Sequence, residues 1–421
     1  MFVLRSGIRY RRALAAFAVL ALPLALAACG GGDHENDKPA AASSGRNSAY
    51  LAAQAGDVIG VRIEELNPTQ GAIGYDQIYY KLGRWQGDFS RPTWPRNSMP
   101  YLDYLNRTIG KKFDDYCEDT GRSARAQPFA SVQEAERARL DDPSTFTCLD
   151  EPGAHPEALK TVVVGWDGNL YLTDGHHSFS ALREIADGGP KLKVWVKVDA
   201  NYSHIPTREA FWQRLVDERK AWLRDGDNQP ITVDQLPKRL GLAHAEEPGG
   251  MQDDPYRSLV YFTRDVAYSN GGLPEFAEFL WGDWLRRQTA NGSLAPLSNY
   301  KTGPSAPLAS VLAESTLKKD LSVAGSNDSY AALVRDAALR MNTLAGGDAV
   351  FGDTTARQLG HFTLLAGQEA GTPTKAARDA LEELPRMDVK SDGSPRTGGK
   401  LRYSASYRHC GKPAPGTCWG W

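Results

Sequence analysis

The sequence has little cysteine, no strong excess of charge of either sign, and no long apolar run after its N-terminal segment. Its 421 residues include 5 Cys, and 49 basic side chains stand against 51 acidic ones. The phosphate-binding loop of P-loop NTPases, the dinucleotide fingerprint G-x-G-x-x-G and the nucleophile elbow G-x-S-x-G are all absent. These absences exclude the corresponding NTPase, dinucleotide-dependent and serine-hydrolase mechanisms.

The first 28 residues indicate an export signal rather than part of the fold. Four arginines precede an apolar segment, residues 13–26, that is too short for a spanning helix. The segment ends in Leu26-Ala27-Ala28-Cys29, which resembles the lipobox of bacterial lipoproteins and predicts lipidation at Cys29. A plain secretory signal cut near Ala28 is the alternative. Either signal places the protein outside the cytoplasm.

A lipid at Cys29 makes a membrane the first expected partner, with the chain facing the periplasm. Gly30 follows, where an Asp retains many such lipoproteins at the inner membrane, so the outer membrane is favoured. Residues 29–56 comprise the lipidated cysteine and a flexible tether. Removing residues 1–28 leaves 45 basic and 51 acidic side chains, a net charge of −6. The mature chain therefore has no strong nucleic-acid footprint.

Four cysteines remain after Cys29, and an even number in an oxidising compartment suggests two disulfides. All three pairings are open. The favoured one joins Cys117 to Cys148 and Cys410 to Cys418, because each pair is local and the second closes a Pro- and Gly-rich tail. A four-cysteine zinc site is the alternative, although no pair has the close spacing that zinc ligands usually show.

Apolar periodicity predicts short strands interspersed with helices. The expected strands are residues 57–66, 161–164, 170–172 and 192–198, the second and third joined as a hairpin. The expected helices are residues 75–82, 131–140, 179–186, 208–224, 256–268, 274–287, 330–344 and 354–365. Residues 87–158 are expected to be irregular outside that one helix. This order of strands and helices along the chain predicts an α+β fold with a small mixed sheet over residues 57–290. A mostly helical extension is expected to follow over residues 291–421.

The densest polar chemistry lies in Asp174-Gly175-His176-His177-Ser178, between an expected strand and an expected helix. The first backbone N–H groups of a helix are unpaired and can hold a phosphate. A histidine there can donate to an oxyanion or exchange a proton near neutral pH.

These residues carry a family resemblance. Residues 161–199 resemble the ParB/sulfiredoxin fold, and the wider segment from Val61 to Trp284 resembles the ParB-like nuclease group within it. The early strand ends in a Pro/Gln turn at Pro68 and Gln70, as in that superfamily. In the later glycine turn, ParB proteins have Gly-Glu-Arg-Arg and sulfiredoxins have Gly-Cys-His-Arg, where this chain has Gly-His-His-Ser. The missing cysteine and arginines argue against sulfinic-acid reduction and chromosome segregation, so the resemblance implies the fold more than an activity.

The resemblance implies a phosphate-binding turn that uses Gly175, His177 and Ser178. Asp174, His176 and His177 are the candidate catalytic residues, as proton carriers or as groups that orient one another. Structural alternatives stay open, because Asp174 and Ser178 also suit a helix cap and His176 can bond to the sheet.

Glu65 and Gln70 are expected to line the same pocket by fold analogy, and solvent-exposed turn positions are the alternative. A divalent metal near Asp174 is a further option, since nucleases often use such an ion to activate water. Adjacent histidines chelate one ion poorly, however, and the usual spacings of paired histidine ligands are absent.

Two functions follow from these observations. The first is a periplasmic hydrolase of phosphoesters or nucleotides, in which His177 contacts phosphate and Asp174 or His176 assists proton transfer. The second is a non-catalytic, lipid-anchored module that binds a ligand or an envelope partner in a repurposed pocket.

Overall fold

The computed structural model describes residues 46–85, 94–317, 328–362 and 374–413, together with Thr417 and Trp419. These residues belong to one compact unit, Gly45–Trp421. The predicted signal, Cys29 and most of the predicted tether lie outside the described residues. Within the described ranges, no helix is both long and apolar enough to cross a membrane.

Five short strands form one mixed sheet in the order β1-β6-β4-β5-β2. The strands are β1 (Val58–Arg62), β2 (Leu66–Pro68), β4 (Lys160–Val164), β5 (Leu170–Leu172) and β6 (Lys193–Asn201). Strands β4 and β5 pair antiparallel as the predicted hairpin, whereas β4 with β6 and β2 with β5 are parallel pairs. The predicted α+β fold with a small mixed sheet is confirmed.

The predicted single strand over residues 57–66 is wrong, because a one-turn 3-10 helix, Ile63–Glu65, divides it into β1 and β2. These two strands lie at opposite edges of the sheet. Three residues span at most about 10 Å, whereas the edges of a flat five-stranded sheet lie about 19 Å apart. The sheet must therefore curl until its two edge strands, β1 and β2, approach each other. The parallel pairing of β2 with β5 places the ends of these two strands side by side.

Most of the expected helices are present, with shifted ends. The expected ones that form are α1 (Tyr75–Arg84), α4 (Val132–Arg137), α5 (His176–Glu184), α6 (Arg208–Asp217), α7 (Pro255–Thr263), α8 (Ala277–Ala290) and α10 (Tyr330–Met341). Helices that were not individually expected are α2 (Met99–Arg107), α3 (Ile109–Asp119), α9 (Leu308–Val311), α11 (Lys375–Glu383) and α12 (Lys400–Cys410). Two additional strand pairs are β3 (Ala72–Ile73) with β7 (Gln252–Asp253), and β8 (Ala349–Phe351) with β9 (Thr354–Thr355).

Two helix predictions were wrong. The segment expected to be largely irregular contains α2 and α3, whose aromatic side chains Tyr101, Tyr104 and Phe113 are buried in the main core. Aromatic residues are weak helix formers, so core packing rather than propensity makes these helices. The segment predicted as a helix from residue 354 begins instead with β9 and a 3-10 turn at Arg357–Leu359, and its residues from 363 lie outside the described range.

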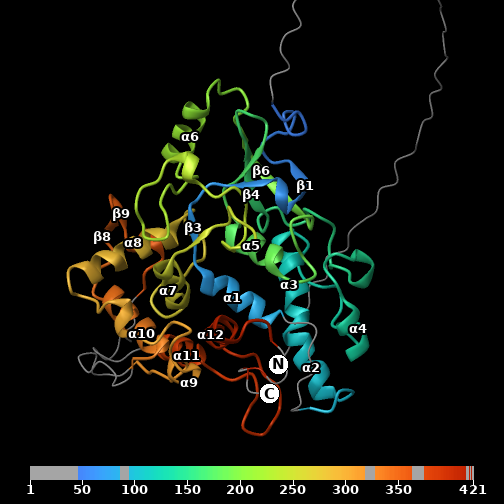
Figure 1. Cartoon of the computed structure of the whole chain (residues 1–421), viewed down its shortest axis with the longest axis vertical. Helices are drawn as coiled ribbons and strands as arrows, with labels where there is room; N and C mark the ends of the chain where they lie inside the picture. The colour runs from blue at the N-terminus through green and yellow to red at the C-terminus, as the bar shows by residue number, and fades with distance from the viewer. Residues whose placement is uncertain are drawn as a thin grey trace, which may run out of the picture. The chain divides into compact units, whose positions relative to one another are not determined.

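The C-terminal segment packs on α1, the first α-helix of the described chain, and Figure 1 shows α12 beside it. The buried carboxylate of Asp76 on α1 is the polar centre of this contact. It accepts hydrogen bonds from the Tyr330 hydroxyl at 2.7 Å and the Ser404 hydroxyl at 3.0 Å. Arg408 of α12 forms an ion pair with the same carboxylate at 2.9 Å. The two regions therefore share one polar network.

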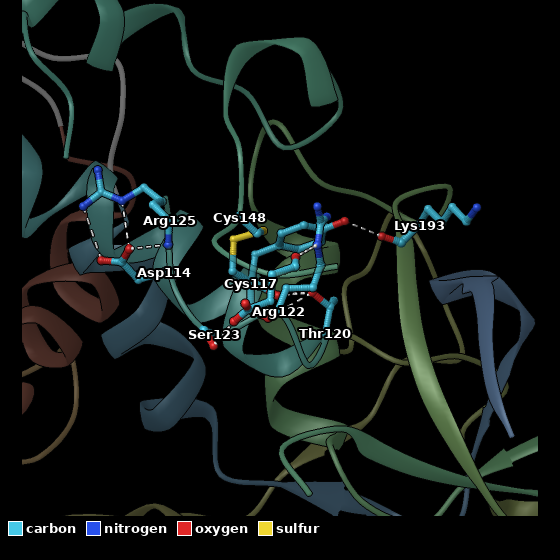
Figure 2. Close-up of a disulfide and its surroundings, with 10 residues drawn as sticks. Asp114, Cys117, Thr120, Arg122, Ser123, Arg125, Cys148 and Lys193 are labelled. Carbon is cyan, nitrogen blue, oxygen red and sulfur yellow. Dashed lines mark hydrogen bonds and ion pairs between the residues drawn. A yellow bond between two sulfur atoms is a disulfide. The ribbon is translucent and has the colours of Figure 1, made fainter. Parts of the chain in front are cut away.

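The predicted disulfide between Cys117 and Cys148 is confirmed, with the two Cα atoms 5.6 Å apart. It joins the end of α3 to the loop that precedes β4, and the Asp114–Arg125 ion pair lies nearby (Figure 2). Cys418 lies outside the described residues, so its pairing with Cys410 stays a prediction.

Removing the confirmed disulfide by the double substitution Cys117→Ser, Cys148→Ser should lower the free energy of unfolding by ~3–4 kcal/mol. The reason is that the bond closes a loop of 31 residues in the unfolded chain. Urea denaturation of the chain from Gly30 onward measures the change in the free energy of unfolding. An unchanged midpoint in the double variant would contradict the stabilising role.

Candidate functional site

The turn between β5 and α5 requires glycine at position 175. Gly175 has φ +103°, in the left-handed region, and a Cβ there would lie 2.6 Å from Cγ of Lys160. Lys160 begins β4, which runs antiparallel to β5, so it lies where β5 ends. The sheet therefore places a lysine beside the predicted phosphate turn.

No side chain caps the helix that leaves this turn. Gly175 is the N-cap residue of α5, and the exposed side chain of Asp174 makes no capping hydrogen bond. The Ser178 side chain instead helps to lower the pKa of the Asp119 carboxylate on α3. The capping roles considered for Asp174 and Ser178 are therefore wrong, and the helix start keeps its N–H groups for another acceptor.

His176 has a structural role in the fold. Its ring is only 3% exposed, and its Nε2 accepts the backbone N–H of Thr69, the residue after β2, at 3.2 Å. Burial lowers the pKa of His176 to about 3. The ring is therefore neutral near pH 7, with its proton on Nδ1, and it bonds to the sheet rather than exchanging protons.

His177, the next residue, holds the other end of the same segment. Its Nε2 accepts the backbone N–H of Gly74 at 3.0 Å, which assigns the proton of the neutral ring to Nδ1. Burial, and then the positive charge of Arg257, hold the pKa of His177 well below its ordinary value. The two histidines thus fix the segment that carries Gln70, whose side-chain amide donates to the Ala72 carbonyl at 2.8 Å.

A cavity of about 740 Å³ is lined by the turn and by residues from α1, α3, α7, α8 and α12 or their connections. The strand ends contribute Lys160 and residues 173–178, α1 and α3 contribute Lys81 and Asp119, and the α7–α8 region contributes residues 273–279. All five candidate residues of the motif line it, as does Gln70.

Glu65 is separated from this group. It is not among the lining residues, and its carboxylate accepts the Tyr50 hydroxyl at 2.7 Å and the Arg62 backbone N–H at 2.7 Å. The prediction that Glu65 faces the pocket was therefore wrong, because Glu65 directly precedes β2 and lies near the start of β5, at the opposite end from the turn.

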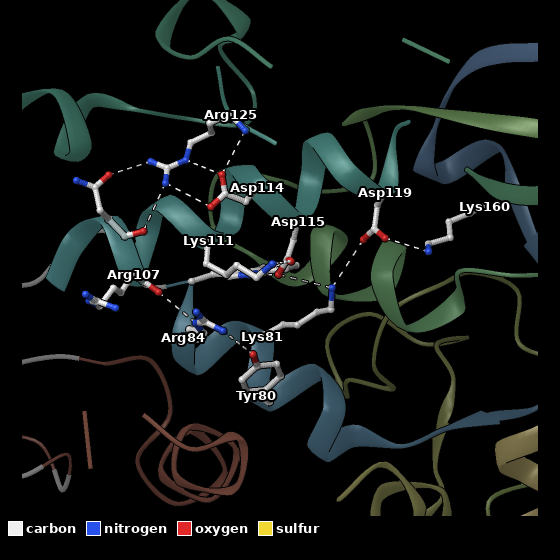
Figure 3. A network of polar contacts seen from close by, with 12 residues as sticks. Tyr80, Lys81, Arg84, Arg107, Lys111, Asp114, Asp115, Asp119, Arg125 and Lys160 are labelled. Carbon is white, nitrogen blue, oxygen red and sulfur yellow. Dashed lines mark hydrogen bonds and ion pairs between the residues drawn. The ribbon is translucent and has the colours of Figure 1, made fainter. Parts of the chain in front are cut away.

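One wall of the cavity carries alternating charges, which Figure 3 shows along α3. The Asp119 carboxylate lies 3.1 Å from Nζ of Lys160 and 3.7 Å from Nζ of Lys81. Burial by itself would raise the pKa of Asp119, but the two ammonium groups outweigh it and hold that pKa below the usual value. Lys111 and Asp115 form a second pair at 2.5 Å.

The facing wall has a buried arginine that is only partly paired. Arg257 is 4% exposed, and its Nη2 donates to Glu278, which also accepts from Arg264 at 2.5 Å and from the Tyr268 hydroxyl at 2.7 Å. Nε and Nη1 of Arg257 have no hydrogen-bond partner among the described residues. An unpaired buried donor costs about 1–3 kcal/mol, so a ligand acceptor at this place would be stabilising.

The family comparison agrees with this architecture. A family model described as "putative ParB-like nuclease" matches residues 59–287, more than half of the chain. The chain belongs to this family. No curated protein matches it. Among solved structures it is similar to the crystal structure of protein Atu1540 from Agrobacterium tumefaciens, with 21% identity and a TM-score of 0.33 over 55% of this chain and 80% of that one.

Within the described part of this ParB-like protein, no three His, Cys, Asp or Glu side chains converge as a metal site. The sequence did not reveal four residues of the cavity, which are Asp119, Lys160, Arg257 and Glu275. Lys160 carried a weak signal, because it directly precedes a strand of the predicted hairpin. The other three come from helices and a loop whose position beside the motif depends on tertiary packing.

The pKa of His176 predicts a pH-dependent stability. In the unfolded chain its pKa is near 6.5, and in the fold it is about 3. Between these values the unfolded chain binds the additional proton, so stability present above pH 6.5 is lost as the pH falls toward 3. Replacing His176→Gln keeps an acceptor and removes the titration. The pH slope of the unfolding free energy should become flatter by up to ~1.4 kcal/mol per pH unit.

Chemical denaturation between pH 7 and pH 4 measures this slope. His204→Gln is the matched control, because His204 is exposed. The comparison with wild type is essential, since burial raises the pKa of Asp253 to about 6 and gives a slope of opposite sign. Equal slopes in the wild type and in His176→Gln would contradict the buried neutral ring.

Proposed function

We propose that this protein is an envelope lipoprotein whose ParB-like domain binds and hydrolyses a phosphoester or nucleotide. The observation that supports this best is that the uncapped start of α5 and the half-paired guanidinium of Arg257 line the same cavity. The nuclease description of the family agrees with such a substrate.

A phosphate fits this end of the cavity for electrostatic reasons. The start of a helix offers unpaired N–H groups and the positive end of its macrodipole. Arg257 is near enough to His177 for its charge to lower the pKa of that ring, so guanidinium and helix start act on one region. A guanidinium presents donors in a fork that suits phosphate oxygens. Nδ1–H of His177 is a third donor.

The proton chemistry is assigned to Asp174 rather than to His176. Asp174 is exposed and lines the cavity, so its carboxylate can take a proton from an attacking water. His176 is buried and its Nε2 is already occupied, which leaves it a positioning role. The mildly acidic net charge of the mature chain favours a small phosphoester over a long nucleic acid.

Phosphate binding is tested with Arg257→Lys, which keeps the charge and removes the fork of donors. Its affinity for inorganic phosphate or a nucleoside monophosphate should fall about 10- to 100-fold, the equivalent of losing one or two charge-assisted hydrogen bonds. Isothermal titration calorimetry of the chain from Gly30 onward gives the dissociation constants for both ligands.

The matched control is Arg286→Lys on the neighbouring helix, whose guanidinium pairs with Asp254 at 2.5 Å and does not line the cavity. Its affinity should equal that of wild type. An affinity of Arg257→Lys equal to that of wild type would show that Arg257 does not bind the phosphate.

Turnover of phosphodiesters, nucleotides and DNA, measured with EDTA, Mg²⁺, Mn²⁺ or Zn²⁺, then separates a hydrolase from the non-catalytic binding module. Binding without any turnover would favour the module.

Anchoring is tested in the full chain. Cys29→Ser should abolish incorporation of labelled palmitate and shift the protein from the outer-membrane fraction to the soluble periplasmic fraction or to an unprocessed precursor. Ser43→Ala, in the predicted tether, is the control and should remain lipidated and membrane-bound. Equal labelling of Cys29→Ser and wild type would contradict a lipid at Cys29.

A further inference from the structure

We propose that Glu275 is the general acid of this site, the residue that protonates the leaving oxygen while Asp174 accepts the proton of the attacking water. The inference rests on the proposed phosphoester hydrolysis and adds a catalytic residue to it. Neither the sequence motif nor the family match singles out this position.

Glu275 enters the cavity from a wall different from that of Asp174. It lies in the connection between α7 and α8 and lines the cavity together with Pro274 and Phe276. Its side chain has no hydrogen bond or ion pair with the described part of the chain, in contrast to Glu278 one turn later, which is held by two arginines. Glu275 is therefore a half-buried carboxyl that remains available to a ligand.

The backbone beside Glu275 is held in a costly conformation. Phe276 is the N-cap residue of α8 and has φ +60° and ψ +7°, the left-handed region, which costs a non-glycine residue about 1–2 kcal/mol. Such strain persists where the surrounding structure imposes it and is concentrated at functional sites. The left-handed conformation of Phe276 sets the direction of the backbone next to Glu275, just before α8 begins.

The charges around Glu275 favour its protonated form. Burial raises the pKa of Glu275 to about 7, and the Asp174 carboxylate adds to the rise. Behind it, Asp199 on β6 and Glu218 after α6 act in the same direction, while Lys220, which pairs with both, opposes them. Glu275 can therefore still carry its proton near neutral pH, as a general acid requires.

The step balances without a further reactant. The water oxygen forms a bond to phosphorus as Asp174 takes its proton, and the bond from phosphorus to the leaving oxygen breaks as Glu275 gives its proton to that oxygen. The products are a phosphomonoester and an alcohol, and a proton exchange through water restores Asp174 and Glu275. In-line displacement needs its acid and base on different sides of the phosphorus, which suits residues from two walls.

The test compares leaving groups. Glu275→Gln should lower kcat about 100-fold or more on a dithymidine phosphodiester, whose alkoxide leaving group needs a proton. On bis(4-nitrophenyl) phosphate, whose leaving group is stable without a proton, kcat should fall less than about 10-fold. KM should stay near the wild-type value for both substrates, and the loss of activity above about pH 7 should disappear in the variant.

Glu209→Gln is the matched control, an exposed glutamate on α6 that is not among the residues lining the cavity and should behave like wild type. An equal loss on both substrates, or none on either, with active wild-type enzyme would overturn the role of Glu275 and leave the hydrolase intact. No turnover of either substrate by wild type under any metal condition would overturn the hydrolase itself, and Glu275 with it.

Discussion

The site depends on two hydrogen bonds in which adjacent histidine rings accept backbone N–H groups. His176 holds Thr69 and His177 holds Gly74, so both ends of the segment between β2 and α1 are fastened to the first turn of α5. This arrangement is possible because β2 and β5 are parallel neighbours in the sheet, so both strands end at the same edge. The pair of rings thus adds to the β2–β5 pairing and to the packing of α1 on α5 in fixing the turn.

Ion pairs between the lining residues allow many charged side chains to lie around one cavity. The Asp119, Lys81 and Lys160 network neutralises itself on one wall, and Glu278 neutralises most of two arginines on another. Among the groups that these pairs leave over are a helix start, two guanidinium nitrogens and the carboxyl groups of Asp174 and Glu275. Such a site would bind a ligand through these unpaired groups, because the charges of the neighbouring ion pairs largely cancel.

Local patterns in the sequence predicted the elements that carry strong periodicity. The alternation of Val194, Val196 and Val198 with lysines gave β6, and the Asp-Gly turn gave the β4–β5 hairpin. The break between β1 and β2 was not visible, because Ile63 continues the apolar pattern while the backbone changes direction. Likewise, the motif identified one wall of the cavity. Arg257 and Glu275 lie about 80 to 100 residues further along the chain, and only packing brings them there.

The contact between α1 and α12 has a consequence for the cavity. Lys400, the first residue of α12, lines the cavity together with Gln70, so its walls draw on segments far apart in the sequence. The family match ends at residue 287, whereas α12 begins at Lys400. A chain cut back to the matched segment would therefore lack one lining lysine and the two α12 side chains, Ser404 and Arg408, that hold Asp76. The cavity of this protein is thus completed by residues outside the segment that defines its family.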